Sequence, residues 1–123
     1  MDFQKAPDIQ TRLEILVKGL VFSHIDSGKI VAFRSFGSKA RAQARIWSFP
    51  RIWQMALNTS PHYCIEVLSE KFDRLSGPEQ TKILIHELLH IPKNFSGALL
   101  PHRGRGRKID RREVEKFFKK LKK

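Results

Sequence analysis

The chain has 123 residues, the size of a single domain that can bury a hydrophobic core. It carries 24 Lys and Arg against 12 Asp and Glu, a net charge of +12, and it has no run of 18 apolar residues. This composition excludes a membrane-spanning protein, and residues 1–8 do not resemble a signal peptide. We therefore expect a soluble, cytoplasmic protein with no membrane partner.

The first third of the chain predicts a helix followed by a hairpin. Asp8 is a candidate N-cap for a helix that runs to about Lys18, with apolar residues on one face and Gly19 at its end. Residues 25–29 form a predicted turn between the apolar runs 20–22 and 30–33, which indicates a hairpin.

The middle of the chain predicts further strands. Residues 40–49 are expected to form a strand with Arg41 and Arg45 on one face, ended by Pro50. Residues 51–57 fit a short helix or another strand, because periodicity cannot decide over so short a run. Residues 63–68 are apolar-rich and predict a strand, in which Cys64 is expected to be a small core residue.

A second helix is predicted from Pro78 to His90. Ser76 is a candidate N-cap, Pro78 falls in the first turn and Glu79 lies three residues after the cap. Pro92 disfavours a helical conformation in the residue before it and so ends the helix just past His90.

This helix contains an H-E-x-x-H motif, from His86 to His90. Residues four apart lie one above the other on a helix, so both imidazoles can offer a ring nitrogen to one metal ion. Glu87 then borders the open coordination position. The pattern is typical of catalytic zinc sites. The alternative is a surface helix with two solvated histidines, which the apolar character of the segment disfavours.

A catalytic zinc usually has three protein ligands, and His102 is the best candidate for the third. It follows His90 by 12 residues, through a turn-rich loop at 94–97 that can fold back. Asp110 and Glu113 are acidic alternatives from a later segment. A further alternative is that His102 only hydrogen-bonds within the loop.

The C-terminal end is strongly basic. Residues 103–123 hold 11 basic and 3 acidic residues, a charge of +8. We expect a flexible basic linker at 103–108, a helix at 109–121 that rests an apolar face on the domain, and fraying at 119–123. The expected organisation is a domain at 1–108 with a basic helix or tail at 109–123 attached to it. The positive charge would attract nucleic acid or acidic partners, or serve only as a solvated tail.

The order of these elements resembles that of zincin-like metallopeptidases. A closer resemblance, to a family of small metallopeptidases of archaea and phages, covers most of the chain up to His102. It is carried by these segments: 33–38, 44–46, 63–67, 72–75, 84–92 and 95–97. The resemblance implies a minimal zincin-like α+β fold, with a small twisted mixed sheet packed on the N-terminal and metal helices and a C-terminal helix. It also implies that His86, His90 and His102 are the ligands and that Glu87 is the general base.

We therefore expect a zinc-dependent metallopeptidase that hydrolyses peptide bonds in a peptide or protein substrate, with water activated by zinc and Glu87. Tyr63, His62 or Arg103 could supply a donor for the oxyanion, and the sequence does not rank them. The alternative is a metal-binding, nucleic-acid-associated or regulatory module without turnover that uses the basic C-terminal surface. A closed structural zinc site is disfavoured, because the single cysteine lies outside the cluster.

Overall fold

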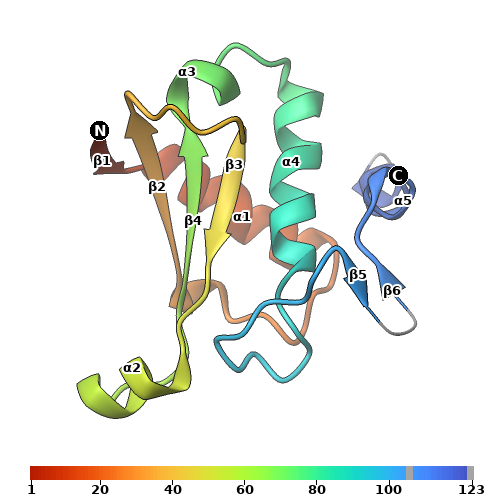
Figure 1. The fold of residues 1–123 in the computed structure, drawn as a ribbon. Coiled ribbons are helices and arrows are strands. Elements are labelled where there is room, and N and C mark those ends of the chain that lie inside the picture. Colours follow the sequence, from red (N-terminus) through yellow and green to blue (C-terminus); the bar gives the residue numbers. More distant parts are fainter. Residues whose placement is uncertain (105–106, 122–123) are drawn as a thin grey trace.

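The computed structural model describes residues 1–104 and 107–121. Helices and strands alternate irregularly along the chain, and most of the helices lie beside one sheet (Figure 1). The elements are, in order, β1 (Asp2–Lys5), α1 (Pro7–Gly19), the 3₁₀ turn η1 (Ser27–Lys29), β2 (Ile30–Phe36), β3 (Ala44–Trp47), α2 (Arg51–Leu57), β4 (Tyr63–Leu68), α3 (Ser69–Phe72), α4 (Gly77–Leu89), β5 (Arg103–Gly104), β6 (Arg107–Lys108) and α5 (Arg111–Leu121).

The main sheet has four strands in the order β1-β2-β4-β3. The two central strands, β2 and β4, are parallel, and each edge strand is antiparallel to its neighbour. The sheet is therefore small and mixed, and the predicted α+β class is confirmed. β3 is the edge strand that lies nearest to α4.

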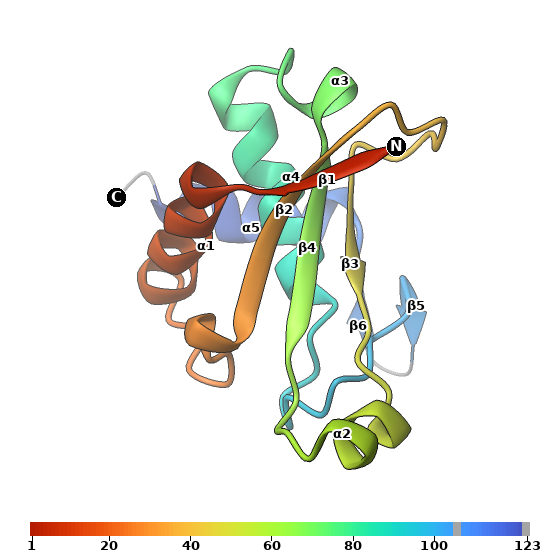
Figure 2. The same cartoon turned by 90° about the vertical axis from the view of Figure 1, so that its left-hand side faces the viewer.

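One face of the sheet packs on α1 and α4 (Figures 1 and 2). Alternate residues of the two central strands face these helices and are almost completely buried, among them Ile30, Ala32, Ile65 and Val67. The first four residues of β2 alternate between buried and partly exposed, whereas all residues of β4 except Cys64 are buried.

No described helix covers the other face of the sheet, which is turned toward the viewer in Figure 2. Cys64 lies on this face and is half-buried, so its prediction as a core residue was wrong. Glu66 is nevertheless buried there, because Arg45 Nε donates to its carboxylate at 2.7 Å and the Trp47 indole N–H donates at 3.0 Å. Charged groups are rarely buried without such partners.

The N-terminal helix forms as predicted, but its cap does not. Ala6 is the N-cap residue and Pro7 opens the helix, because a proline at the first helical position has no N–H to leave unpaired. Asp8 falls in the first turn and pairs with Arg34 at 2.9 Å instead of capping the helix. The residue in the left-handed region after the helix is Val21, with φ of 54°, rather than Gly19.

The hairpin predicted across residues 20–33 was wrong. Leu20 and Phe22 are buried, but they lie in a loop that fills the core rather than in a strand. Asp26 accepts a hydrogen bond from the Gly28 N–H and begins η1, and β2 then pairs with β1 and β4. The side chains of β1 are all exposed, so this edge strand leaves no burial pattern in the sequence.

Of the other elements predicted in the middle region, one is shorter than predicted, one proves to be a helix and one is confirmed. The strand expected at 40–49 is β3, which covers only Ala44–Trp47, so Arg41 lies outside it. Residues 51–57 form a helix, α2, and the strand predicted at 63–68 is confirmed as β4 with the same bounds.

At the C-terminal end, a flexible linker was predicted at 103–108. This prediction was wrong for residues 103–104 and 107–108, which form two short strands. β5 and β6 pair antiparallel, Arg103 with Lys108, and residues 105 and 106 lie outside the described ones. α5 packs on α4 with Val114 buried, as the apolar pattern predicted. It remains helical through Leu121, so the fraying predicted from residue 119 is not seen there, and residues 122–123 lie outside the described ones. Within the described chain, no helix is long and apolar enough to span a membrane.

Candidate metal centre

α4 carries the H-E-x-x-H motif on the side of the helix next to its buried face. Ser76 accepts a hydrogen bond from the Glu79 backbone N–H at 3.2 Å, and the predicted cap is confirmed. Leu84, Ile85 and Leu88 are fully buried in the core and fix the rotation of the helix. The helix therefore presents its two histidines and the glutamate beside the edge of the sheet.

Three histidine nitrogens converge on one point. His86 Nε2 lies 3.1 Å from His102 Nε2 and 3.4 Å from His90 Nε2, and the three ligand atoms lie within 4.8 Å of one another. Nitrogens that bind one tetrahedral zinc at about 2.0–2.1 Å are separated by about 3.3–3.4 Å. The spacing of these side chains therefore fits a metal ion of that size.

The hydrogen bonding and charge of the histidines also suit metal binding. His90 Nδ1–H donates to the Leu100 carbonyl at 2.5 Å, which leaves Nε2 with a free lone pair that faces the cluster. Burial, reinforced by the neighbouring histidines, lowers the pKa of His86 to about 4, and burial also lowers the pKa of His90. Both rings are therefore neutral at pH 7, the form that binds metals.

The loop that carries His102 is held at several places. The Leu100 backbone N–H donates to the His90 carbonyl at 2.7 Å, so this residue is tied to the end of α4 through both of its backbone groups. Gly97 has φ of 93°, and a Cβ there would meet the Phe49 carbonyl oxygen at 2.3 Å. Only glycine allows this close approach.

Tyr63 makes a further attachment of the loop. Its hydroxyl donates to the Ala98 carbonyl at 2.8 Å and accepts from the Gly97 backbone N–H at 2.8 Å. Tyr63 was a candidate oxyanion donor from the sequence. In the structure, both hydrogen bonds of its hydroxyl are made with the backbone of the loop. His62 contacts the Ser60 carbonyl at 2.8 Å, and the side chain of Arg103 lies outside the described ones.

The acidic alternatives for the third ligand are used elsewhere. Asp110 Oδ1 accepts from the Glu113 backbone N–H at 3.0 Å and so begins α5. The Glu113 carboxylate lies 4.0 Å from Lys116 Nζ. Neither residue belongs to the group of potential metal ligands found among the described residues, which contains His102.

Glu87 is 8% exposed and borders the cluster. Burial raises its pKa to about 8, and a hydrogen bond from the Ile46 backbone partly opposes this rise. A nearby positive charge favours the ionised form of a carboxyl group, so a cation between the histidines would lower this pKa again.

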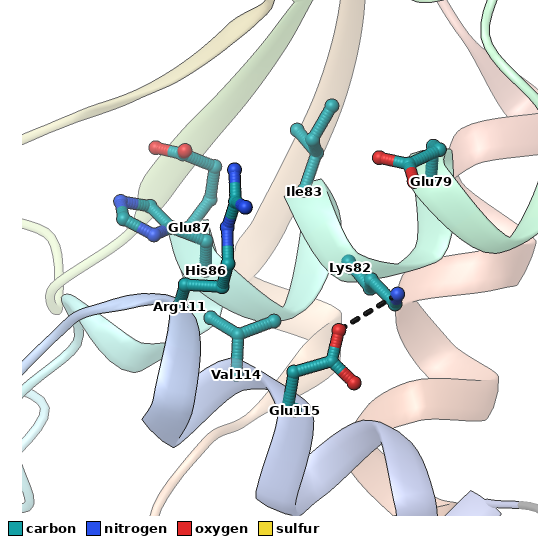
Figure 3. Close-up of a pocket in the computed structure, with 8 residues that line it drawn as sticks. All are labelled: Glu79, Lys82, Ile83, His86, Glu87, Arg111, Val114 and Glu115. Carbon is teal, nitrogen blue, oxygen red and sulfur yellow. Dashed lines mark ion pairs between the residues drawn. The ribbon is translucent and has the colours of Figure 1, made fainter.

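Two cavities meet at His86 and Glu87. One, of 570 Å³, runs along β3 and residues 99–102. The other, of 390 Å³, lies between α4 and α5, and Figure 3 shows its lining residues. Arg111 lines this second cavity. No pattern in the sequence singled out Arg111, because it is one of several basic residues near the C-terminus.

Fold and site together define an α+β domain in which one helix and the loop after it bring together three histidines that could hold a metal ion, beside a buried glutamate. A family model described as "Putative phage metallopeptidase" matches residues 1–123, and the chain belongs to this family. Comparisons with curated proteins and with solved structures found no match. The family description indicates a metal-dependent hydrolase that acts on peptide or protein substrates.

Proposed function

We propose that this protein is a zinc-dependent peptidase in which His86, His90 and His102 bind the metal and Glu87 is the general base. The observation that supports this most strongly is the convergence of three imidazole nitrogens beside a buried carboxyl group. Zinc is favoured because it commonly takes three histidines and keeps one position open, whereas magnesium and calcium prefer oxygen ligands.

The chain's own residues supply the base and its orientation. Zinc in such a site acts as a Lewis acid, which polarises the scissile carbonyl and makes water easier to deprotonate. Glu87 accepts the proton from the attacking water and passes it to the leaving amine. Burial raises the pKa of Glu87 and a cation between the histidines would lower it, so two opposed effects act on the group that must both accept and donate a proton.

The position of β3 suggests how a substrate binds. β3 is an edge strand, and the larger cavity runs beside it to the histidines. An extended peptide that adds to this edge through backbone hydrogen bonds would place a peptide bond at the cluster.

The test is the Glu87→Gln variant, with Glu14→Gln on the exposed side of α1 as the matched control. We expect both variants to bind one zinc per chain, measured by elemental analysis. Cleavage of a peptide library, followed by mass spectrometry, should fall by about 10²- to 10⁴-fold in Glu87→Gln alone. Wild-type activity in metal-loaded Glu87→Gln would contradict the role of Glu87, and a zinc-loaded wild type that cleaves no peptide would contradict the proposed reaction.

The family match supports a peptide or protein substrate and gives no support to a nucleic-acid partner. The intact Glu87 likewise disfavours a module without turnover, because a binding role does not need a buried carboxyl group beside the metal.

A further inference from the structure

Arg111 is the arginine that lines the cavity between α4 and α5. Arg34 pairs with Asp8 and Asp73, and Arg45 pairs with Glu66. Arg111, in contrast, makes no ion pair within residues 1–104 and 107–121. It is the first residue of α5, directly after the capping residue Asp110, so its backbone is fixed at the start of the helix.

The Arg111 side chain lies at a cavity that reaches the proposed catalytic residues. His86 and Glu87 line the same cavity, and Figure 3 shows the guanidinium on the side of the cavity where these two residues lie. An arginine guanidinium binds carboxylates in a bidentate geometry and is always charged. The guanidinium at this position is suited to pair with a substrate carboxylate.

The rest of the cavity lining is mostly charged, with Glu79 among it, and has two apolar side chains. Ile83 of α4 and Val114 of α5 line its middle. At the other end, Lys82 and Glu115 form an ion pair at 2.7 Å that joins the two helices (Figure 3). These two charges satisfy each other, which leaves Arg111 as the lining cation without a partner in the described chain.

The two cavities together suggest the path of a substrate. A peptide that lies along β3 reaches His86 and Glu87, and its next residue then enters the cavity between α4 and α5. With a volume of 390 Å³, this cavity is near the lower end of the range for small-molecule sites and has room for a single residue.

We propose that the cavity between α4 and α5 binds the last residue of a peptide and that Arg111 pairs with its free C-terminal carboxylate. Resting on the proposed peptidase function, this inference names the substrate class as peptides with a free C-terminal carboxylate. Hydrolysis breaks the last peptide bond: the water oxygen becomes part of the new carboxylate, and the released amine takes a proton. Arg111 is then the residue that determines specificity.

Two peptides of one sequence test this, one ending in a free carboxylate and the other in an amide. The zinc-loaded variants to compare are Arg111→Gln and the control Arg112→Gln, which changes an exposed neighbour that does not line the cavity. The wild type and the control should favour the free acid by about 10- to 100-fold in kcat/KM, since a hydrogen-bonded charged group contributes about 1.5–3 kcal/mol. Arg111→Gln should lose this preference, mainly through KM.

Two outcomes would overturn the inference. One is a wild type that cleaves the amide as well as the acid. The other is an equal fall in kcat for both peptides in Arg111→Gln, which would make Arg111 a stabiliser of the oxyanion.

A binding measurement separates this inference from the proposed function. In calorimetry with metal-free protein, N-acetyl-alanyl-leucine should bind the wild type more tightly than its C-terminal amide does, and Arg111→Gln should remove the difference. Selective binding of the acid without turnover would support the site while contradicting the peptidase. Equal binding of acid and amide by the wild type would contradict the site whatever the activity.

Discussion

Removing one buried hydroxyl should loosen the loop that carries the third histidine. Tyr63 is 1% exposed, and its hydroxyl joins β4 to the backbone of Gly97 and Ala98. A Tyr63→Phe substitution keeps the ring and its edge-to-face contact with Phe95, at 5.1 Å between centroids. The substitution therefore tests the two hydrogen bonds with little change in packing.

The expected loss follows from the two groups left without a partner. The Gly97 N–H is buried, and an unpaired buried donor costs about 1–3 kcal/mol, whereas exposed Ala98 can exchange its bond for one to water at a smaller cost. We expect Tyr63→Phe to lose about 2–3 kcal/mol of unfolding free energy. For a chain of this length, that loss lowers Tm by roughly 6–15 °C.

Urea unfolding gives this free energy, and zinc titration gives the effect on the site. The substitution can weaken the docking of the loop as well as the global stability. Each 1.4 kcal/mol lost from the docking of the loop should weaken zinc binding about tenfold. Thr11→Val is the control, because it removes an exposed hydrogen bond within α1 and should stay within about 0.5 kcal/mol. Wild-type stability in Tyr63→Phe would refute the structural role, and a large fall in kcat at saturating zinc would indicate a catalytic one.

Two further predictions concern the third ligand and acid stability. His102→Ala should weaken zinc binding by at least about 100-fold, the upper end of the loss from removing residues that only support a ligand. Asp110→Ala and Glu113→Ala should leave zinc affinity near wild type, and the reverse pattern in zinc titrations would make the site one of carboxylate type. Hydrogen bonds from Arg34 lower the pKa of Asp8 and Asp73, so their contribution to stability is present above about pH 4 and is lost as pH falls through the lowered values. Urea unfolding from pH 2 to 7 should therefore show a wild-type advantage over Arg34→Gln that shrinks below pH 4, with exposed Arg51→Gln as control; a difference that does not vary with pH would contradict this reasoning.

The features that the sequence predicted well are those encoded locally. The metal helix has a cap, a proline in its first turn and an apolar stripe, all within 15 residues, and it forms with nearly the predicted bounds. The strand at 63–68 and the C-terminal helix likewise carry their own apolar pattern. His86 and His90 are neighbours because of helix geometry alone, so their closeness could be predicted without any tertiary contact.

The features that the sequence missed depend on distant partners. β1 is recognisable only through its pairing with β2, since its side chains are all exposed. The apolar residues Leu20 and Phe22 suggested a strand, yet they fill the core from a loop. The Leu100 carbonyl that orients His90 is a backbone group, and backbone groups leave no mark in a sequence.

The basic C-terminal segment shows how composition can hide a local role. Its charge of +8 suggested a surface that attracts nucleic acid or acidic partners, or a solvated tail. In the structure, Ile109 and Val114 join the same buried core cluster as α1 and α4, so this segment packs on the domain as its apolar pattern predicted. The packing of Val114 on α4 also holds the neighbouring residue Arg111 at the edge of the histidine cluster. The basic side chains of α5 are exposed, and Arg111 among them also lines a cavity that it shares with Glu87. A single charge placed at a cavity by buried neighbours can select a substrate, while the same charge in water would only raise solubility.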